Sequence, residues 1–323
     1  MIVGQNRAVE QFASAWHSRK VHHAWLLAGP KGVGKATFAL DAARRVLAEA
    51  AGPPFDLPLL QTPESHPIVK LIDAGSHPDM RWLQRLQKDN SDSLARNISV
   101  DQVRALGDFL TLTAALSAWR VAVIDTIDEL EGAAANALLK ILEEPPANTI
   151  FFLVSHAPGR LLPTIRSRCR RLDFETLEND AMTSILQRDA PNLSAAERDR
   201  VIAMAGGSAG KALAFASLGL AKLEDAAQTI LQRGDPTNAL RSALASELGK
   251  KASAEQYAAF LDLAPSLIAR RARDLRGEPL ARALDAYGKA RELSGVARRL
   301  SLDPAATVFQ IGGLLADAAS LKR

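Results

Sequence analysis

The chain has 323 residues, of which 47% are hydrophobic and 24% are charged, a balance typical of a soluble globular protein with two or three domains. A net charge of +4 permits contact with nucleic acid without requiring it. The single cysteine excludes a disulfide within the chain and an all-cysteine metal site, and we expect a cytoplasmic protein without a signal peptide or a membrane-spanning segment.

The first half of the chain alternates predicted helices and strands. In chain order, the apolar patterns predict a helix at 6–18, a strand at 24–28, a helix at 35–50, a strand at 80–83, a helix at 100–112, a strand at 120–125, a helix at 133–143 and a strand at 149–155. Six prolines between residues 51 and 79 predict an irregular excursion. Such alternation is typical of a parallel, doubly wound sheet.

The second half of the chain carries only helical patterns. No apolar pattern typical of a strand follows residue 173 or so. Helices are predicted over residues 178–187 and 195–219, and Gly206 and Gly207 interrupt the second of them. Residues 224–323 are predicted to be wholly helical. A helical region therefore follows the predicted α/β sheet.

A phosphate-binding loop stands between the strand at 24–28 and the helix at 35–50. Residues 29–37 read GPKGVGKAT, which matches the pattern GxxxxGK, and Lys35 would pair with phosphate oxygens. The next residue, Ala36, has no hydroxyl for Mg²⁺, and Thr37 lies one residue too late, about 100° round the helix. A site that binds ATP, a vestigial site and a plain glycine turn all stay open. Three glycines would let backbone N–H groups approach a phosphate: Gly29, Gly32 and Gly34.

The strand at 120–125 ends in an acid that suits a nucleotide site. Asp125 would face Mg²⁺, and the alternative is an ordinary aspartate that caps the next loop. Thr126 follows where an active ATPase of this kind usually has glutamate, and a threonine cannot act as a general base toward water. Asp128 and Glu129 are nearby but out of frame. The chain is thus poorly equipped to cleave a nucleotide.

Residues 160–171 form a basic segment with five arginines. It is either a solvated loop or the source of one guanidinium that reaches a phosphate, as an arginine finger does from a neighbouring chain. Charge alone does not decide between the two. The lone Cys169 is expected to be a small packing residue, and no spacing of His, Cys, Asp and Glu predicts a metal site. The arginines are Arg160, Arg166, Arg168, Arg170 and Arg171.

Several stretches together resemble the delta-prime subunits of bacterial DNA polymerase III clamp loaders, which belong to the AAA+ superfamily. The resemblance covers residues 1 to about 220, and its last two stretches are far more specific than the phosphate-binding loop. The stretches are VGQ at 3–5, HAWLL at 23–27, GPKGVGKAT at 29–37, HPD at 77–79, ISVDQVR at 98–104, AANALLKILEEPP at 134–146 and LLPTIRSRC at 161–169.

The resemblance implies three domains: an α/β AAA+ P-loop domain over 1–173, a small helical lid domain over 174–222 and an all-α collar domain over 223–323. Gamma/tau and delta subunits would be its partners in a five-subunit ring, and the sliding clamp and primed DNA would be reached through that complex. Polymerase activity would belong to the holoenzyme, and no membrane is involved. Many relatives carry a zinc module near residues 50–70, which this chain cannot form.

The resemblance also implies roles for single residues. Arg168 of the Ser-Arg-Cys triplet would complete in trans the ATP site of a neighbouring gamma/tau subunit. Ser155 would stand at the first sensor position, whereas Gly210 falls near the position of the second sensor arginine. Ala36, Thr126 and Gly210 all weaken hydrolysis by this chain itself. Together with the retained Arg168, they imply a rigid stator with weak or no ATPase of its own.

Two other functions stay open. The nearly complete P-loop fits an ATP-hydrolysing gamma/tau-type subunit, which steady turnover abolished by Lys35→Ala would establish. A different AAA+ remodeller, such as a helicase loader, fits the fold but not the two specific stretches. Failure to associate with any loader subunit would favour that last alternative.

Overall fold

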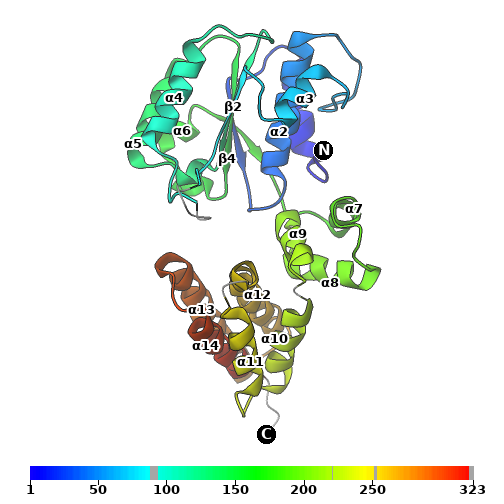
Figure 1. Cartoon of the computed structure of the whole chain (residues 1–323), viewed down its shortest axis with the longest axis vertical. Helices are drawn as coiled ribbons and strands as arrows, with labels where there is room; N and C mark the ends of the chain where they lie inside the picture. Colours follow the sequence, from blue (N-terminus) through cyan, green and yellow to red (C-terminus); the bar gives the residue numbers. More distant parts are fainter. Residues whose placement is uncertain (88–93, 220, 251–252, 320–323) are drawn as a thin grey trace. The chain divides into compact units, whose positions relative to one another are not determined.

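Five parallel strands form the centre of the first half of the chain (Figure 1). Their order in the sheet is β2-β3-β4-β1-β5, so the strand that precedes the P-loop lies between β4 and β5. The register pairs Ala28 with both Ser155 and Asp173. The strands are β1 (Ala24–Ala28), β2 (Met80–Leu83), β3 (Arg120–Asp125), β4 (Thr149–Ser155) and β5 (Arg170–Asp173). The predicted parallel sheet is confirmed, with one strand more than the sequence patterns predict.

The computed structural model describes residues 1–87, 94–219, 221–250 and 253–319. It divides into two compact units, residues 1–181 and 182–323. The first unit contains the whole sheet, and the second contains most of the helical region. The further division into a lid and a collar at residue 222 stays a prediction.

Helices cover both faces of the sheet in the first unit (Figure 1). On one face α1 (Asn6–His17), α2 (Lys35–Ala51) and α3 (Pro67–Asp73) pack on the sheet, and on the other α4 (Val100–Thr111), α5 (Gly132–Glu143) and α6 (Pro163–Arg166) do. Each face of the sheet has its own hydrophobic core. Along β3, Val121 and Val123 belong to the core beneath α1 to α3, whereas Ala122 and Ile124 belong to the core beneath α4 to α6. This alternation follows from the period of two in a strand.

The proline-rich excursion is organised around one buried arginine of α2. Arg45 is 3% exposed, and its Nη1 donates to the carbonyl oxygens of Leu57 at 2.7 Å and Gln61 at 2.8 Å. Its guanidinium also pairs with Glu49 and lies 4.9 Å from the ring centroid of Phe55. A buried cation that donates to loop carbonyls fixes a segment that has little regular structure of its own.

One predicted irregular stretch is helical instead. The prolines predict no regular element over residues 51–79, yet α3 spans Pro67–Asp73. Pro67 stands at the start of this helix, where its missing N–H costs nothing, and the His66 side chain caps the helix by accepting from the N–H of Ile68. The prediction was wrong because proline breaks the interior of a helix but suits its first turn.

The described part of the second unit consists of helices and the short segments that connect them. Its helices pack through small and aliphatic residues, and Phe260 and Ile268 of α12 are fully buried. None of the helices in the described ranges combines the length and apolar character needed to cross a membrane. The helices are α7 (Asn179–Asp189), which begins in the first unit, α8 (Ala195–Ala205), α9 (Ala209–Ser217), α10 (Ala221–Arg233), α11 (Ala239–Leu248), α12 (Ala254–Ala272), α13 (Gly277–Leu300) and α14 (Pro304–Asp317).

Candidate functional site

The P-loop joins the end of β1 to the first turn of α2, as predicted. Two of its glycines have positive φ angles that other residues rarely adopt, and at Gly29 the neighbouring backbone also leaves no room for a side chain. A Cβ on Gly29 would lie 2.2 Å from the carbonyl oxygen of Phe174, and one on Gly34 would lie 2.5 Å from Cδ1 of Ile2. Gly34 precedes α2 without a side-chain cap. The first N–H groups of this 17-residue helix therefore suit an anion such as a phosphate.

Lys35 lies inside the loop that it belongs to. Its amino group donates to the carbonyl oxygen of Gly29 at 2.6 Å and to that of Pro30, and the residue is 3% exposed. Burial lowers the pKa of Lys35 to about 8, against the opposing attraction of Asp128 and Asp125. The amino group is therefore mainly charged at neutral pH, and a phosphate would compete with the two carbonyls for it.

Asp125 and Thr126 lie at the end of β3. Burial raises the pKa of Asp125 above its ordinary value. The Thr126 hydroxyl lies 3.3 Å from Oδ1 of Asp125 and 3.3 Å from Nε2 of His156. The hydroxyl thus connects the acid to a histidine. Hydrolysis would need a general base at residue 126, but this position has a threonine whose hydroxyl contacts Asp125 and His156.

The two carboxylates that follow are engaged elsewhere. Asp128 accepts from the Ser155 hydroxyl at 2.8 Å and from the N–H groups of His156 at 2.5 Å and Ala157 at 3.3 Å. Glu129 pairs with Arg85 at 2.8 Å. Asp128 therefore ties the end of β4 to η1 (Ile127–Glu129). Neither carboxylate is positioned to replace a catalytic glutamate at residue 126.

His156 also belongs to this site, although no sequence motif predicts it. Burial, with the nearby cations Lys35 and Lys31, lowers its pKa to about 4, so the ring is neutral at neutral pH. Its Nδ1 is buried and has no hydrogen-bond partner among the described residues. A lone histidine after a strand gives no indication of where its ring points. Only the fold brings it to Thr126.

The Ser-Arg-Cys triplet follows α6, and each of its residues has a distinct place. The Ser167 hydroxyl donates to the Thr164 carbonyl at 3.1 Å, and Nη1 of Arg168 donates to the same oxygen at 2.9 Å. Nη2 of Arg168 pairs with Oε1 of Glu143 at 2.7 Å. Cys169 packs against the core of α4 to α6, and burial raises the pKa of its thiol to about 12.

Arg168 and the P-loop lie at opposite ends of the parallel strands. Arg170, the first residue of β5, pairs with Trp25 near the start of β1, whereas Gly29 follows the end of β1. The five residues of β1 span roughly 13 Å at about 3.3 Å per residue. Arg168 is therefore remote from the nucleotide site of its own chain, and the predicted residues form two separate groups.

The predicted nucleotide residues meet where β1, β3 and β4 end. Ser155 is fully buried, and its carbonyl oxygen accepts from the N–H of Gly29 at 3.3 Å. Ala36 and Thr37 occupy the first turn of α2, as the loop pattern predicts. Gly210 lies in α9, within the second unit. In the described residues, no group of three or more His, Cys, Asp or Glu side chains could hold a metal ion.

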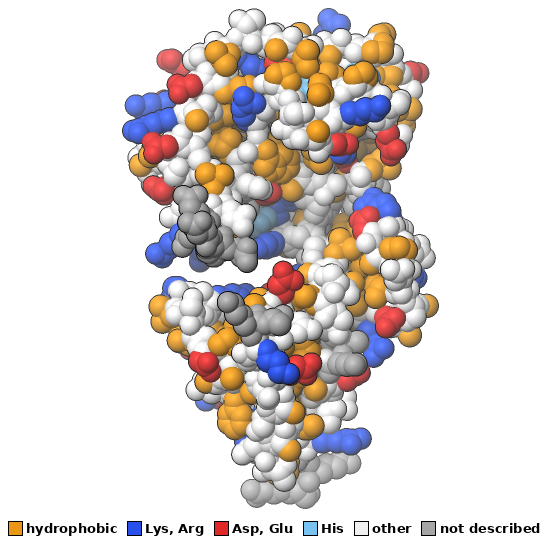
Figure 2. Space-filling model, in the orientation of Figure 1, with side chains coloured by type: hydrophobic (Ala, Val, Ile, Leu, Met, Phe, Trp, Pro, Cys, Tyr) orange, Lys and Arg blue, Asp and Glu red, His pale blue; other side chains and the backbone are white. Residues whose placement is uncertain are grey.

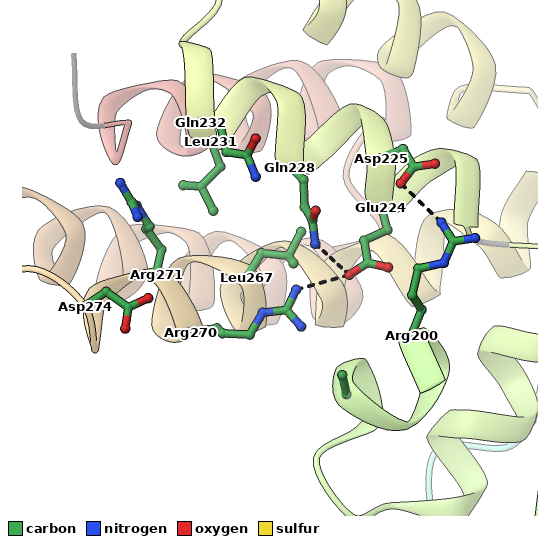
Figure 3. Close-up of a pocket in the computed structure, with 11 residues that line it drawn as sticks. Arg200, Glu224, Asp225, Gln228, Leu231, Gln232, Leu267, Arg270, Arg271 and Asp274 are labelled. Carbon is green, nitrogen blue, oxygen red and sulfur yellow. Dashed lines mark hydrogen bonds and ion pairs between the residues drawn. The ribbon is translucent and has the colours of Figure 1, made fainter. Parts of the chain in front are cut away.

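A cavity of about 430 Å³ lies in the second unit between α8, α10 and α12 (Figure 3). The buried carboxylate of Glu224 accepts from Gln228 at 2.9 Å and from Arg270 at 3.1 Å, and Arg200 pairs with Asp225 at 3.6 Å. Three arginines and three acids line the cavity, so it favours neither anions nor cations. Basic and acidic side chains are likewise interspersed on the face of the first unit in Figure 2.

Comparisons with known proteins agree on a family. A family model described as "DNA polymerase III, delta subunit" matches residues 4–178. "DNA polymerase III subunit delta'" of Pseudomonas aeruginosa is 36% identical over 189 residues, which are 58% of this chain and 53% of the relative. "DNA polymerase III subunit tau" of Bacillus subtilis is 32% identical over 198 residues, which are 61% of this chain and 32% of the relative. The matched part thus spans about half or less of each relative.

A solved structure extends the comparison to the whole fold. The gamma subunit-related protein of Thermotoga maritima superimposes with a TM-score of 0.50 at 16% identity, covering 96% of this chain and 98% of that one. Together with the sheet order, this likeness confirms the predicted fold class, an α/β domain with a parallel sheet followed by many C-terminal helices.

Proposed function

Because the chain belongs to the DNA polymerase III delta-subunit family, we propose that it is a delta-prime-type subunit of the clamp loader, which helps to load the sliding clamp on primed DNA. Its partners in a five-subunit ring would be gamma/tau and delta subunits. The clamp and the DNA would be contacted through the assembled complex. A role in bacterial replication implies a cytoplasmic protein.

Within that complex the chain would act as a stator that does not hydrolyse ATP. Three observations support this proposal: Ala36 lacks a hydroxyl for Mg²⁺, the Thr126 hydroxyl is engaged by Asp125 and His156, and Asp128 is held by three donors. The glycines, the first turn of α2 and Lys35 fit the phosphates of a nucleotide. By contrast, Ala36 has no hydroxyl to hold Mg²⁺, and Thr126 has no carboxylate to activate water. ATP bound here would therefore persist without turnover.

Arg168 would act on the ATP site of a neighbouring gamma/tau subunit. The observation that carries this proposal is the location of Arg168 beside the start of β1, whereas its own P-loop follows the end of that strand. A guanidinium there cannot reach a nucleotide on Lys35 of the same chain. It can stabilise the charge that develops on a phosphate held by another chain, which is the role of an arginine finger.

The test is ATP hydrolysis by a reconstituted loader in the presence of clamp and primed DNA. Arg168→Ala should lower this activity by a large factor, about 10³-fold at a site that depends on the finger, with assembly intact. Arg166→Ala, two residues away and exposed, is the matched control and should leave the rate unchanged. Equal rates for wild type and Arg168→Ala would contradict the finger.

A gamma/tau-type ATPase is the second candidate. Relatives named tau and gamma match this chain at 32% and 30% identity, and the loop keeps the GxxxxGK pattern. This candidate requires steady turnover by the chain itself. The two functions therefore differ in which chain carries the active site, and ATP hydrolysis by the isolated protein separates them.

A further inference from the structure

We propose that Glu143 is a positioning residue for Arg168, holding the guanidinium in the orientation in which it meets the phosphate of the neighbouring site. The inference rests on the proposed function of Arg168 in trans. Glu143 is the last residue of α5 and belongs to the AANALLKILEEPP stretch, to which the sequence patterns assign no role.

Arg168 is held at two points. Nη2 pairs with Oε1 of Glu143 at 2.7 Å, and Nη1 donates to the carbonyl oxygen of Thr164 at 2.9 Å. Two contacts on different nitrogens fix the plane of the guanidinium, whereas one contact would leave it free to rotate. A guanidinium has five N–H donors, so three have no partner among the described residues and can bind phosphate oxygens.

A common core sets the distance between the two residues. Leu138 and Leu142 of α5 pack in the same core cluster as Ile165 of α6, and Cys169 packs against that cluster. The end of α5 and the triplet loop are thus attached to one rigid support. A side chain that must be presented to another subunit gains from such preorganisation, because a displacement of about 1 Å can cost up to 100-fold in rate.

Stability alone does not account for Glu143. The side chains of Glu143 and Arg168 are 48% and 33% exposed, and ion pairs this exposed contribute little to folding. A carboxylate in the last turn of a helix is also disfavoured by the helix dipole, which the nearby arginine offsets. The pair therefore gives more to the orientation of Arg168 than to the stability of the fold.

The test compares four variants of the chain in the reconstituted loader: Glu143→Gln, Glu144→Gln, Arg168→Ala and the double variant Glu143→Gln/Arg168→Ala. Glu143→Gln should lower kcat about tenfold, less than loss of the finger itself, and leave the KM for ATP unchanged. Glu144 is the matched control, because its exposed carboxylate has no ion pair within the described ranges. The double variant should be no slower than Arg168→Ala alone.

The outcomes separate this inference from the proposed function. If Arg168→Ala leaves the rate unchanged, the finger itself is refuted. If Arg168→Ala is slow but Glu143→Gln matches wild type, Glu143 does not position the arginine. An equal loss from Glu143→Gln in both backgrounds would indicate a general structural effect, and a faster Glu143→Gln loader would show that the glutamate restrains the arginine. Either result overturns the inference.

Discussion

The Thr126 hydroxyl and the imidazole of His156 lie 3.3 Å apart, joining the ends of β3 and β4 beside the P-loop. The same hydroxyl reaches Asp125, so a continuous polar chain connects an acid to a neutral histidine. These contacts explain how the chain accommodates a threonine where hydrolysis calls for a base. The residue is part of the scaffold at this site.

The first prediction concerns hydrolysis by the isolated protein. Since neither Ala36 nor Thr126 supports the chemistry, the purified chain should release no phosphate from Mg²⁺-ATP above background. A coupled phosphate-release assay with and without primed DNA measures this. Steady turnover that disappears in Lys35→Ala would instead establish the gamma/tau-type alternative.

The second prediction concerns the proline-rich excursion. Arg45→Ala removes two charge-assisted hydrogen bonds to the loop carbonyls of Leu57 and Gln61 and the ion pair with Glu49, so the free energy of unfolding should decrease by about 2–4 kcal/mol. Urea denaturation measures this loss. Arg104→Ala is the control, because Arg104 is 70% exposed and pairs with an exposed Asp101, and it should cost less than about 1 kcal/mol. Equal effects would show that Arg45 does not hold the segment.

The third prediction concerns pH. A histidine in an unfolded chain titrates near pH 6.5, whereas His156 in the folded protein has a pKa of about 4. Between these values the unfolded state binds a proton that the folded state does not, so stability contributed by the neutral ring decreases as the pH falls from 6.5 to 4. NMR titration of the ring should give a midpoint near pH 4. A midpoint near 6.5 would place the ring in solvent.

The fourth prediction concerns the HPD stretch. The carboxylate of Asp79 is buried and accepts from the N–H groups of Ala115, Leu116 and Ser117 at 2.6 to 2.8 Å. Burial opposes its ionisation, but these donors and His77 hold its pKa below the ordinary value. Asp79→Asn turns one acceptor into a donor that faces N–H groups, so unfolding should become about 1–3 kcal/mol easier at neutral pH.

The sign of the pH effect at Asp79 follows from its lowered pKa. The stability that it contributes is present above the unfolded value near 3.8 and is lost as the pH falls through the folded value. Asp79→Asn should therefore differ most from wild type near pH 7 and least in strong acid, by thermal denaturation across that range. Asp101→Asn, at an 84% exposed side chain, should follow wild type throughout.

Local patterns predict most of the sheet and miss its last strand for a physical reason. The runs that form β1, β3 and β4 are apolar because both faces of these strands are buried. In β5 only Leu172 is buried, and its arginines and Asp173 are exposed, so the segment has the composition of a polar loop. Its strand character comes from pairing with β1, which no short window of sequence shows.

The same limit applies to the candidate site. The loop pattern locates Lys35 and its glycines because consecutive residues form that part of the site. Glu143 and Arg168 are 25 positions apart, and Thr126 and His156 are 30 apart, so only tertiary structure brings them together. The motifs predict which side chains carry function, whereas the contacts that orient those side chains follow from the fold.

The partial burial of Cys169 has a practical consequence for experiments on this protein. With a thiol pKa of about 12, only about one molecule in 10⁵ carries the reactive thiolate at pH 7. Maleimide dyes and spin labels should therefore react slowly with the wild-type chain. A cysteine introduced at an exposed position should react much faster, so a brief reaction would attach a fluorescent or paramagnetic probe mainly there, without first replacing the native residue.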